Sequence, residues 1–157
     1  MRACCFTGHR ILPRGDVSAL IRAIDRHIKE LIADGVCEFR TGGALGFDTL
    51  AALRVLTLRE QYPECRLSLI LPCRDQSERW REGDRALYED ILSKADEVRY
   101  VAERYTPDCM NARNRALVDG SDVCLAYLTH TSGGTRNTYL YALREGLTVI
   151  NLAKELS

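Results

Sequence analysis

One stretch decides the fold of this chain: Thr41-Gly42-Gly43-Ala44-Leu45-Gly46-Phe47-Asp48. It joins a short strand-like run to a helix-like run, so its backbone N–H groups lie at the positive end of a helix dipole, where phosphate is favoured. Glycine suits such a turn, because a Cβ would block positive φ angles and the close approach of a ligand. A second turn, Ser132-Gly133-Gly134-Thr135, has the same setting. Together the two turns predict a site for a nucleotide or another phosphorylated ligand.

The rest of the chain alternates between strand-like and helix-like runs. Short apolar runs predict strands over 3–7, 37–40, 66–71, 97–101, 122–128 and 147–151. Apolar residues at helical spacing predict helices over 17–34 with Asp16 as N-cap, 47–62, 79–92, 109–118 with Asp108 as cap, and about 135–144. This order predicts an α/β fold, in which a mostly parallel sheet of about six strands has helices on both faces.

Ligands of such sheets bind outside the carboxyl ends of the strands, where the strand order reverses. The segments 7–10, 41–48 and 132–135 all follow predicted strands, and so does Pro72. We therefore expect these segments to converge on one crevice.

Size and charge limit the classes of function. The 157 residues are 46% apolar and form one domain over 1–157, with 22 Lys and Arg balanced by 22 Asp and Glu. Zero net charge argues against nucleic-acid binding driven by bulk positive charge. No apolar run approaches the roughly 18 residues of a membrane span, and the apolar run after Arg2 is too short for a signal peptide. We expect a cytoplasmic protein without a membrane partner.

The seven cysteines form no CxxC pair and have no zinc-like spacing. Cys4, Cys5, Cys65 and Cys124 lie in or beside apolar runs, where a free cysteine packs as a small hydrophobe. An odd number of cysteines fits a reducing compartment better than a disulfide framework. Histidines are few and unpaired and no carboxylate cluster has metal spacing, so no metal is expected.

Several motifs, in order along nearly the whole chain, resemble the YpsA-like (DUF1273) family of the SLOG superfamily. They are Thr7-Gly8-His9-Arg10, Gly42 to Asp48, Arg79-Trp80, Met110-Asn111-Ala112-Arg113-Asn114, Val118-Asp119-Gly120-Ser121-Asp122, and Gly133-Gly134-Thr135. The resemblance implies a single Rossmann-like nucleotide-binding domain. Related domains often form dimers, so it also implies a homo-oligomer.

The same superfamily contains the lonely-guy phosphoribohydrolases, which hydrolyse the N-glycosidic bond of nucleoside monophosphates. The resemblance places Arg113 on their catalytic arginine, whereas Thr138 stands where they have a catalytic glutamate. A hydroxyl neither stabilises an oxocarbenium-like centre nor acts as a general base near neutral pH. Asp48 and Asp119 are the carboxylates available instead, and the candidate catalytic residues are therefore Arg113 and Asp48.

Each of these predicted ligand contacts has a purely structural alternative. Arg10 is either a bidentate phosphate ligand or part of an ordinary surface loop. Asp48 either binds ribose hydroxyls or a ligand amine, or only stabilises a helix start. Trp80, the only tryptophan, either stacks on a base or packs a helix onto the sheet. Thr135 is a phosphate ligand or a helix N-cap. The full set of predicted contacts is Thr7, Gly8, His9, Arg10, Gly42, Gly43, Ala44, Gly46, Asp48, Arg79, Trp80, Arg113, Asn114, Ser132, Gly133, Gly134 and Thr135.

Three functions are compatible with these features. The first is a module that binds or senses a nucleotide or a nucleotide-derived, ADP-ribose-like ligand without turnover. The second is a phosphoribohydrolase or related N-glycosidase that acts on nucleoside monophosphates. The third is a single-stranded nucleic-acid binder, since DNA-processing protein A shares the superfamily fold; zero net charge and few aromatics count against it. Beyond a nucleotide-like small molecule, no cofactor is implied.

Overall fold

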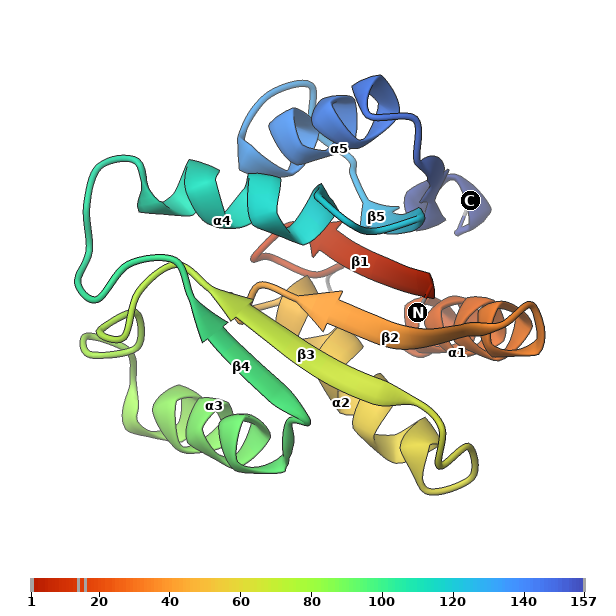
Figure 1. The fold of residues 1–157 in the computed structure, drawn as a ribbon, viewed down its shortest axis with the longest axis horizontal. Coiled ribbons are helices and arrows are strands. Elements are labelled where there is room, and N and C mark those ends of the chain that lie inside the picture. Colours follow the sequence, from red (N-terminus) through yellow and green to blue (C-terminus); the bar gives the residue numbers. More distant parts are fainter. Residues whose placement is uncertain (1, 14, 16, 157) are drawn as a thin grey trace.

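A wholly parallel sheet of six strands, in the order β4-β3-β2-β1-β5-β6, forms the centre of the molecule. The computed structural model describes residues 2–13, 15 and 17–156. The strands are β1 (Arg2–Gly8), β2 (Val36–Thr41), β3 (Arg66–Leu71), β4 (Glu97–Tyr100), β5 (Val123–Tyr127) and β6 (Thr148–Asn151). The arrowheads of β1 to β4 point toward the left in Figure 1, and both labelled termini lie at the right. The predicted α/β architecture is confirmed.

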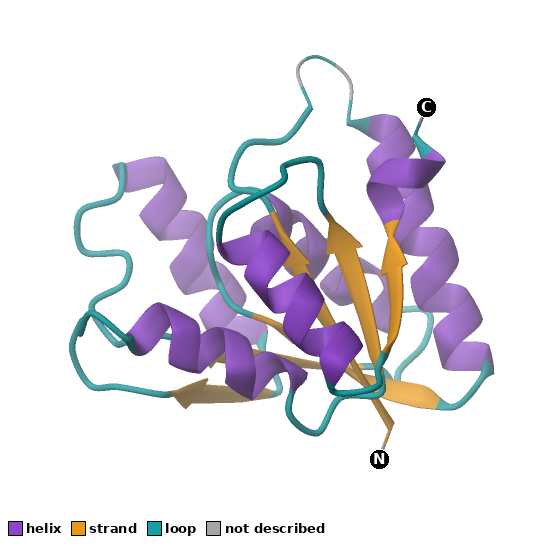
Figure 2. Ribbon diagram, turned by 90° about the horizontal axis from the view of Figure 1, so that it is seen from above, coloured by secondary structure: helices purple, strands orange, loops and turns teal. Residues whose placement is uncertain are grey.

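Helices cover both faces of this sheet, as Figure 2 shows from above. The helices are α1 (Ser18–Ala33), α2 (Phe47–Arg59), α3 (Glu82–Lys94), α4 (Cys109–Val118) and α5 (Gly134–Arg144), followed by a short 3-10 helix, η1 (Leu152–Glu155). α1 and α2 pack on each other and on β2, whereas α4 and α5 pack on each other and on β1. In Figure 1, α4 and α5 lie side by side above β1.

The core follows the alternation of the central strand. Cys4 and Phe6 point into a large cluster with the buried faces of α1 and α2, in which the rings of Phe6 and Phe47 are 6.2 Å apart. Cys5 points the other way, into a smaller cluster with Leu117 of α4 and Ala142 of α5. Because parallel strands are buried on both faces, β1 and β5 are apolar at nearly every position.

The strand order reverses at β1. From β1 the chain proceeds to β2, β3 and β4 on one side, and then returns to place β5 and β6 on the other. The return is fixed at the amino end, where the Ala3 N–H donates to the Asp122 carboxylate at 2.9 Å. The carboxyl end of β1 is therefore the point at which a sheet of this kind opens a ligand crevice.

The structure corrects several predicted boundaries and caps. The helix predicted over 79–92 begins at Glu82, so Arg79 and Trp80 lie in the preceding turn. Asp108 occupies the N-cap position of α4 without a side-chain cap bond, and its carboxylate lies 3.3 Å from Arg115 instead. The N-cap of α5 is Gly133 and not Thr135. The predicted N-cap Asp16 lies outside the described residues.

The four cysteines predicted in apolar runs are buried, and Cys73 and Cys109 are buried as well. Burial raises the pKa of the Cys73 thiol to about 12, so this side chain is not a reactive thiolate near neutral pH. The described helices include none that has both the length and the apolar character to cross a bilayer.

Candidate functional site

A cleft of about 420 Å³ lies at the carboxyl end of β1, where the strand order reverses. Its walls come from the end of β1, the turn before α2 and its first residues, the turn between β3 and α3, one side of α4 and the start of α5. The lining consists of Phe6, Thr7, Gly8, His9, Arg10, Ala44, Asp48, Gln76, Trp80, Met110, Asn111, Arg113, Asn114, Leu117, Gly134 and Thr135. Eleven of these belong to the predicted set, so the segments expected to converge do lie together.

His9 and Arg10 leave β1 at the mouth of the cleft. The His9 ring lies 4.0 Å from that of His130, and its Nε2 accepts the Thr129 backbone N–H at 2.9 Å. Burial, with a smaller contribution from His130, lowers the pKa of His9, so the ring is neutral and only Nδ1–H remains as a donor. Arg10 is exposed, and none of the described carboxylates lies within ion-pair distance of it.

The backbone of the first glycine turn is hydrogen-bonded to side chains of the protein. The Gly43 carbonyl accepts from Gln76 Nε2 at 3.1 Å, and the Ala44 N–H donates to the Asp48 carboxylate at 3.2 Å. Thr49 Oγ1 donates to the Ala44 carbonyl at 2.9 Å. Of the stretch 41–48, Ala44 and Asp48 line the cleft, whereas Gly42, Gly43 and Gly46 do not. The Ala44 N–H is therefore engaged within the protein, and the expected phosphate site of this turn stays a prediction.

Arg113 is the side chain that holds this turn against α4. It is 7% exposed, and its guanidinium donates from Nη1 to the Gly42 carbonyl and from Nε to Asn114 Oδ1 at 2.8 Å. Burial lowers the pKa of Arg113, and the charge of Asp48 opposes this change. Arg113 thus lines the cleft as predicted, but part of its donor capacity is used within the protein.

Asp48 is a buried carboxyl group, 6% exposed, in the wall of the cleft. Burial raises its pKa from 3.8 to about 6, while the Arg113 charge and the backbone N–H groups of Ala44 and Gly42 oppose the rise. This carboxyl group is partly protonated near neutral pH, which makes it both a donor and an acceptor for a ligand.

The second glycine turn is open. Gly133 has φ +104° and its position as N-cap brings no side chain to the first N–H groups of α5. Gly134 and Thr135 line the cleft, while Ser132 and Gly133 are exposed and do not. A Cβ built on Gly134 would meet only Asn114 Nδ2, at 3.9 Å. The dipole end of α5 therefore faces the cleft without a protein cap.

Of the Arg79-Trp80 pair, only Trp80 lines the cleft. Trp80 lines the cleft and meets the Tyr88 ring edge-on, with centroids 5.1 Å apart. Arg79 is exposed and does not line it. The indole therefore packs against α3, as the packing alternative expects, and stacking of Trp80 on a base stays a prediction.

Sequence reasoning missed three polar or flexible lining residues, which are Gln76, Met110 and Asn111. Met110 and Asn111 belong to the same motif as Arg113. Asn111 precedes Asn114 by three residues, so the helical spacing places both on the same side of α4. Gln76 had no local signal, since its role depends on the Gly43 carbonyl 33 residues away.

Thr138 and Asp119 both lie outside the lining of the cleft. Thr138 is 2% exposed, its hydroxyl donates back to the Gly134 carbonyl at 2.9 Å, and it lies outside the cleft. Asp119 accepts the Tyr141 hydroxyl at 2.7 Å and is likewise absent from the lining. Within the described residues, no three His, Cys, Asp or Glu side chains are grouped to hold a metal ion.

Comparison with known proteins places these residues in a family. The family model for YpsA, described as the YspA SLOG family, matches residues 13–147. A UPF0398 protein of Bacillus cereus (strain G9842) is 28% identical over 144 residues, which are 86% of this chain and 78% of the relative. A UPF0398 protein of Bacillus pumilus (strain SAFR-032) is 36% identical over 105 residues, 66% of this chain and 56% of the relative. The resemblance noted from the motifs is confirmed.

Solved structures share the fold at low sequence identity. DNA processing protein A from Helicobacter pylori, described for its single-stranded DNA binding mode, has a TM-score of 0.68 at 17% identity. That match covers 94% of this chain and 63% of the other, so this chain spans less than two thirds of that protein. TM1055 has a TM-score of 0.58 at 18% identity, covering 95% of this chain and 72% of the other. These likenesses show the fold.

Proposed function

The chain belongs to the YspA SLOG family, and from this premise we propose that its cleft binds a nucleotide or a nucleotide-derived phosphorylated ligand without turnover. One observation carries the proposal. The uncapped amino end of α5 and the guanidinium of Arg113 face the same cleft of about 420 Å³. A helix amino terminus and an arginine are both groups that bind phosphate in proteins.

The phosphate is proposed to lie at the start of α5. There the backbone N–H groups of Gly134 and Thr135 are in the first turn, where a helix has no internal acceptors for them. Asn114 Nδ2 adds a donor beside Gly134, and Arg10 brings a further positive charge to the mouth. Anion binding at this place does not require the first glycine turn to move.

The nucleoside is proposed to lie toward Trp80. Phe6, Trp80, Met110 and Leu117 supply the apolar part of the lining, and an indole ring is a suitable surface for a base to stack on. Asp48 supplies a buried carboxyl group within the same cleft, which suits a ribose hydroxyl or an exocyclic amine.

We propose the absence of turnover because of the few carboxyl groups that line the cleft. Asp48 is the only Asp or Glu among the lining residues, and its carboxylate accepts the Ala44 N–H. The position at which related hydrolases carry a glutamate is Thr138, whose hydroxyl is bonded within α5. A carboxylate free to act on the anomeric carbon is therefore missing from the described walls.

Calorimetric titration with AMP tests the proposal, with chromatography of the same samples to detect free adenine. We expect saturable binding, a rise in melting temperature by mass action and no adenine release. Arg10→Gln is expected to weaken AMP binding about tenfold, because an exposed cation at the mouth is removed. Arg22→Gln, an exposed charge change on α1, is the matched control and should leave the affinity unchanged.

Other outcomes point to the alternatives. Adenine release that disappears in Arg113→Lys would establish the phosphoribohydrolase alternative. Binding of a single-stranded oligonucleotide with a steep salt dependence, and no binding of AMP, would favour the nucleic-acid alternative. Light scattering of the purified chain tests the expected homo-oligomer.

A further inference from the structure

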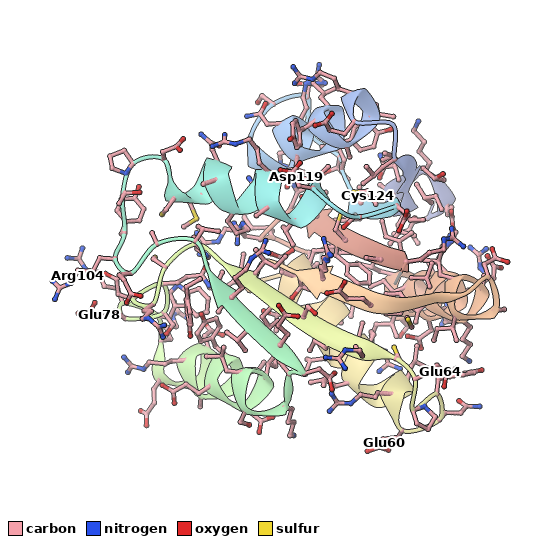
Figure 3. The ribbon with its side chains drawn as sticks, in the orientation of Figure 1. Glu60, Glu64, Glu78, Arg104, Asp119 and Cys124 are labelled. Atoms are coloured by element: carbon pink, nitrogen blue, oxygen red, sulfur yellow. The ribbon has the colours of Figure 1, made fainter. Side chains whose placement is uncertain are left out.

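The loop between β5 and α5, residues 128–133, carries the second glycine turn and has few bonds to the rest of the protein. Residues 129–133 are all exposed, and Figure 1 shows the loop in light blue beside the amino end of α5. In Figure 3 it follows β5, the strand on which Cys124 is labelled. Leu128 is held by Asn151, whose Oδ1 accepts the Leu128 N–H at 3.1 Å and whose Nδ2 donates to the Leu128 carbonyl at 2.9 Å. Beyond Leu128, one hydrogen bond ties the loop to another described element, from the Thr129 N–H to His9 Nε2 at 2.9 Å.

The bond to Thr129 fixes the protonation state of His9. A backbone N–H is always a donor, so the ring nitrogen that accepts it carries no proton. An imidazolium has a proton on both ring nitrogens and therefore has no acceptor left for Thr129. His9 itself is held in place from α2, because its carbonyl accepts the Phe47 N–H at 3.1 Å. The bond between the end of β1 and the loop thus exists only while His9 is neutral.

A second histidine makes this contact more sensitive to charge. The ring of His130 lies 4.0 Å from that of His9, and its Nδ1 lies 2.7 Å from Thr129 Oγ1 within the same loop. Positive charge on both rings is unfavourable at this separation. Burial, with a smaller contribution from His130, lowers the pKa of His9 from 6.5. A charged pair of histidines would therefore repel the loop from β1.

The other titratable and charged groups around His9 do not compensate a charge on it. Among the described Asp and Glu side chains, none lies within ion-pair distance of His9. From β5, Tyr127 presents its ring edge-on with the centroids 6.0 Å apart, and burial raises the pKa of this phenol, so it is uncharged. Arg10 follows His9 in the chain, and Asp48 and Arg113 line the same cleft from α2 and α4. The bond to Thr129 is therefore lost without a carboxylate to replace it.

We propose that the contact between His9 and Thr129 is a pH-sensitive latch, which fastens the loop to β1 when His9 is neutral and releases it when His9 is protonated. Since the pKa of His9 in the folded chain lies below 6.5, the latch is engaged at and above pH 6.5 and is released as the pH falls through the lower value. The latch acts on the chain without a ligand and is independent of the proposed function.

Amide hydrogen exchange, measured by NMR on the full chain, tests the latch. Between about pH 8 and about pH 5 we expect the protection factor of the Thr129 amide to fall tenfold or more. The fall should have the same midpoint as the titration of His9, followed by the ¹⁵N signals of its ring. The Leu128 amide is the internal control, because its acceptor Asn151 does not titrate, and its protection should stay within about twofold.

His9→Gln removes the titrating group and leaves a side chain of similar reach with an amide oxygen as acceptor. Protection of Thr129 in this variant should be independent of pH within about twofold, whether or not the amide oxygen reaches the loop. His130→Gln should keep the response and move its midpoint to higher pH. Asp48→Asn removes a cleft group whose pKa of about 6 falls in the same range, and His27→Gln removes the third histidine of the chain. Both controls should leave the Thr129 response unchanged.

Other outcomes overturn the latch. Constant protection of Thr129 while His9 titrates would show that this bond does not hold the loop. A His9 ring that stays neutral down to about pH 5 would show that the contact does not switch. Equal loss of protection at Thr129 and Leu128 would mean that the end of β5 opens as a whole. A response that persists in His9→Gln would assign the pH dependence to another group.

Discussion

The two glycine turns look alike in sequence and differ in structure. The first, between β2 and α2, has its backbone bonded to Asp48, Thr49 and Gln76. The second, between β5 and α5, is exposed at Ser132, Gly133 and Gly134. The difference teaches that glycine after a strand can serve close packing of the chain on itself or leave a helix start exposed, which is where we propose that the ligand binds.

Gly46 and Gly133 express this difference most simply. Both have positive φ angles, +81° and +104°. A Cβ on Gly46 would overlap the carbonyl oxygen of Arg10, whereas a Cβ on Gly133 would meet nothing within 4 Å. Changes in the first turn should therefore reduce stability, and changes in the second should reduce binding.

Arg113→Met gives the largest expected loss of stability. It leaves the Gly42 carbonyl without its donor and Asp48 without the nearest opposing charge. Removing one partner of a buried charged contact lowers the free energy of unfolding by about 3–5 kcal/mol. Urea denaturation of the variant and the unmodified chain would measure this loss. Adding Asp48→Asn should recover part of the loss. A loss below about 1 kcal/mol would show that Arg113 does not hold the first turn.

Gly46→Ala should cost about 3 kcal/mol, because the added methyl combines a disfavoured φ angle with an overlap on the Arg10 backbone. Gly133→Ala is its matched control and should cost only about 1 kcal/mol, the strain of the φ angle alone. Equal losses in the two variants would remove the distinction between the turns. Urea denaturation of the two variants would measure both losses of stability.

Asp48 makes the stability of the first turn depend on pH. Burial raises its pKa from 3.8 to about 6, so the folded chain holds this proton more tightly than the unfolded chain. The resulting stabilisation is complete below pH 3.8 and is lost as the pH rises through about 6. We expect the difference in unfolding free energy between the unmodified chain and Asp48→Asn to fall by roughly 3 kcal/mol across this window. A flat difference would mean an ordinary pKa for Asp48.

Gly134→Ala is expected to have the smallest effect on stability, within about 0.5 kcal/mol, because its Cβ meets only Asn114 Nδ2 at 3.9 Å. The methyl group intrudes on the space proposed for phosphate, so AMP affinity should fall about fivefold in calorimetric titration. A loss of stability without a loss of affinity would reverse the roles assigned to the turns.

Much of the fold followed from local pattern. The strand at 66–71 and the helix at 109–118 were predicted to the residue, because Pro72 follows the apolar run of the strand and Asp108 precedes the helical spacing. The predicted start of α3 was wrong. Arg79 and Trp80 continue the helical spacing of polar residues in the sequence, but in the structure they lie in the turn before the helix.

The candidate site was predictable in outline and not in its internal bonds. Strand order alone brought 7–10, 44–48 and 134–135 to one cleft. The role of the Gly42 carbonyl was invisible, because its partner Arg113 is 71 residues away in sequence. Local pattern likewise does not tell a turn whose N–H groups face a ligand from one whose N–H groups face Asp48.

The position of β1 has a consequence for how the chain folds. β1 pairs with β2 across a short loop and one helix, but it pairs with β5 only after a separation of 119 residues, as for Ala3 and Asp122. Closing so long a loop is entropically slow, so the β1–β5 contact is expected to form after the β1–β2 contact. The cleft has walls from both sides of this contact, and competence to bind AMP in stopped-flow refolding should therefore appear after most of the helical signal.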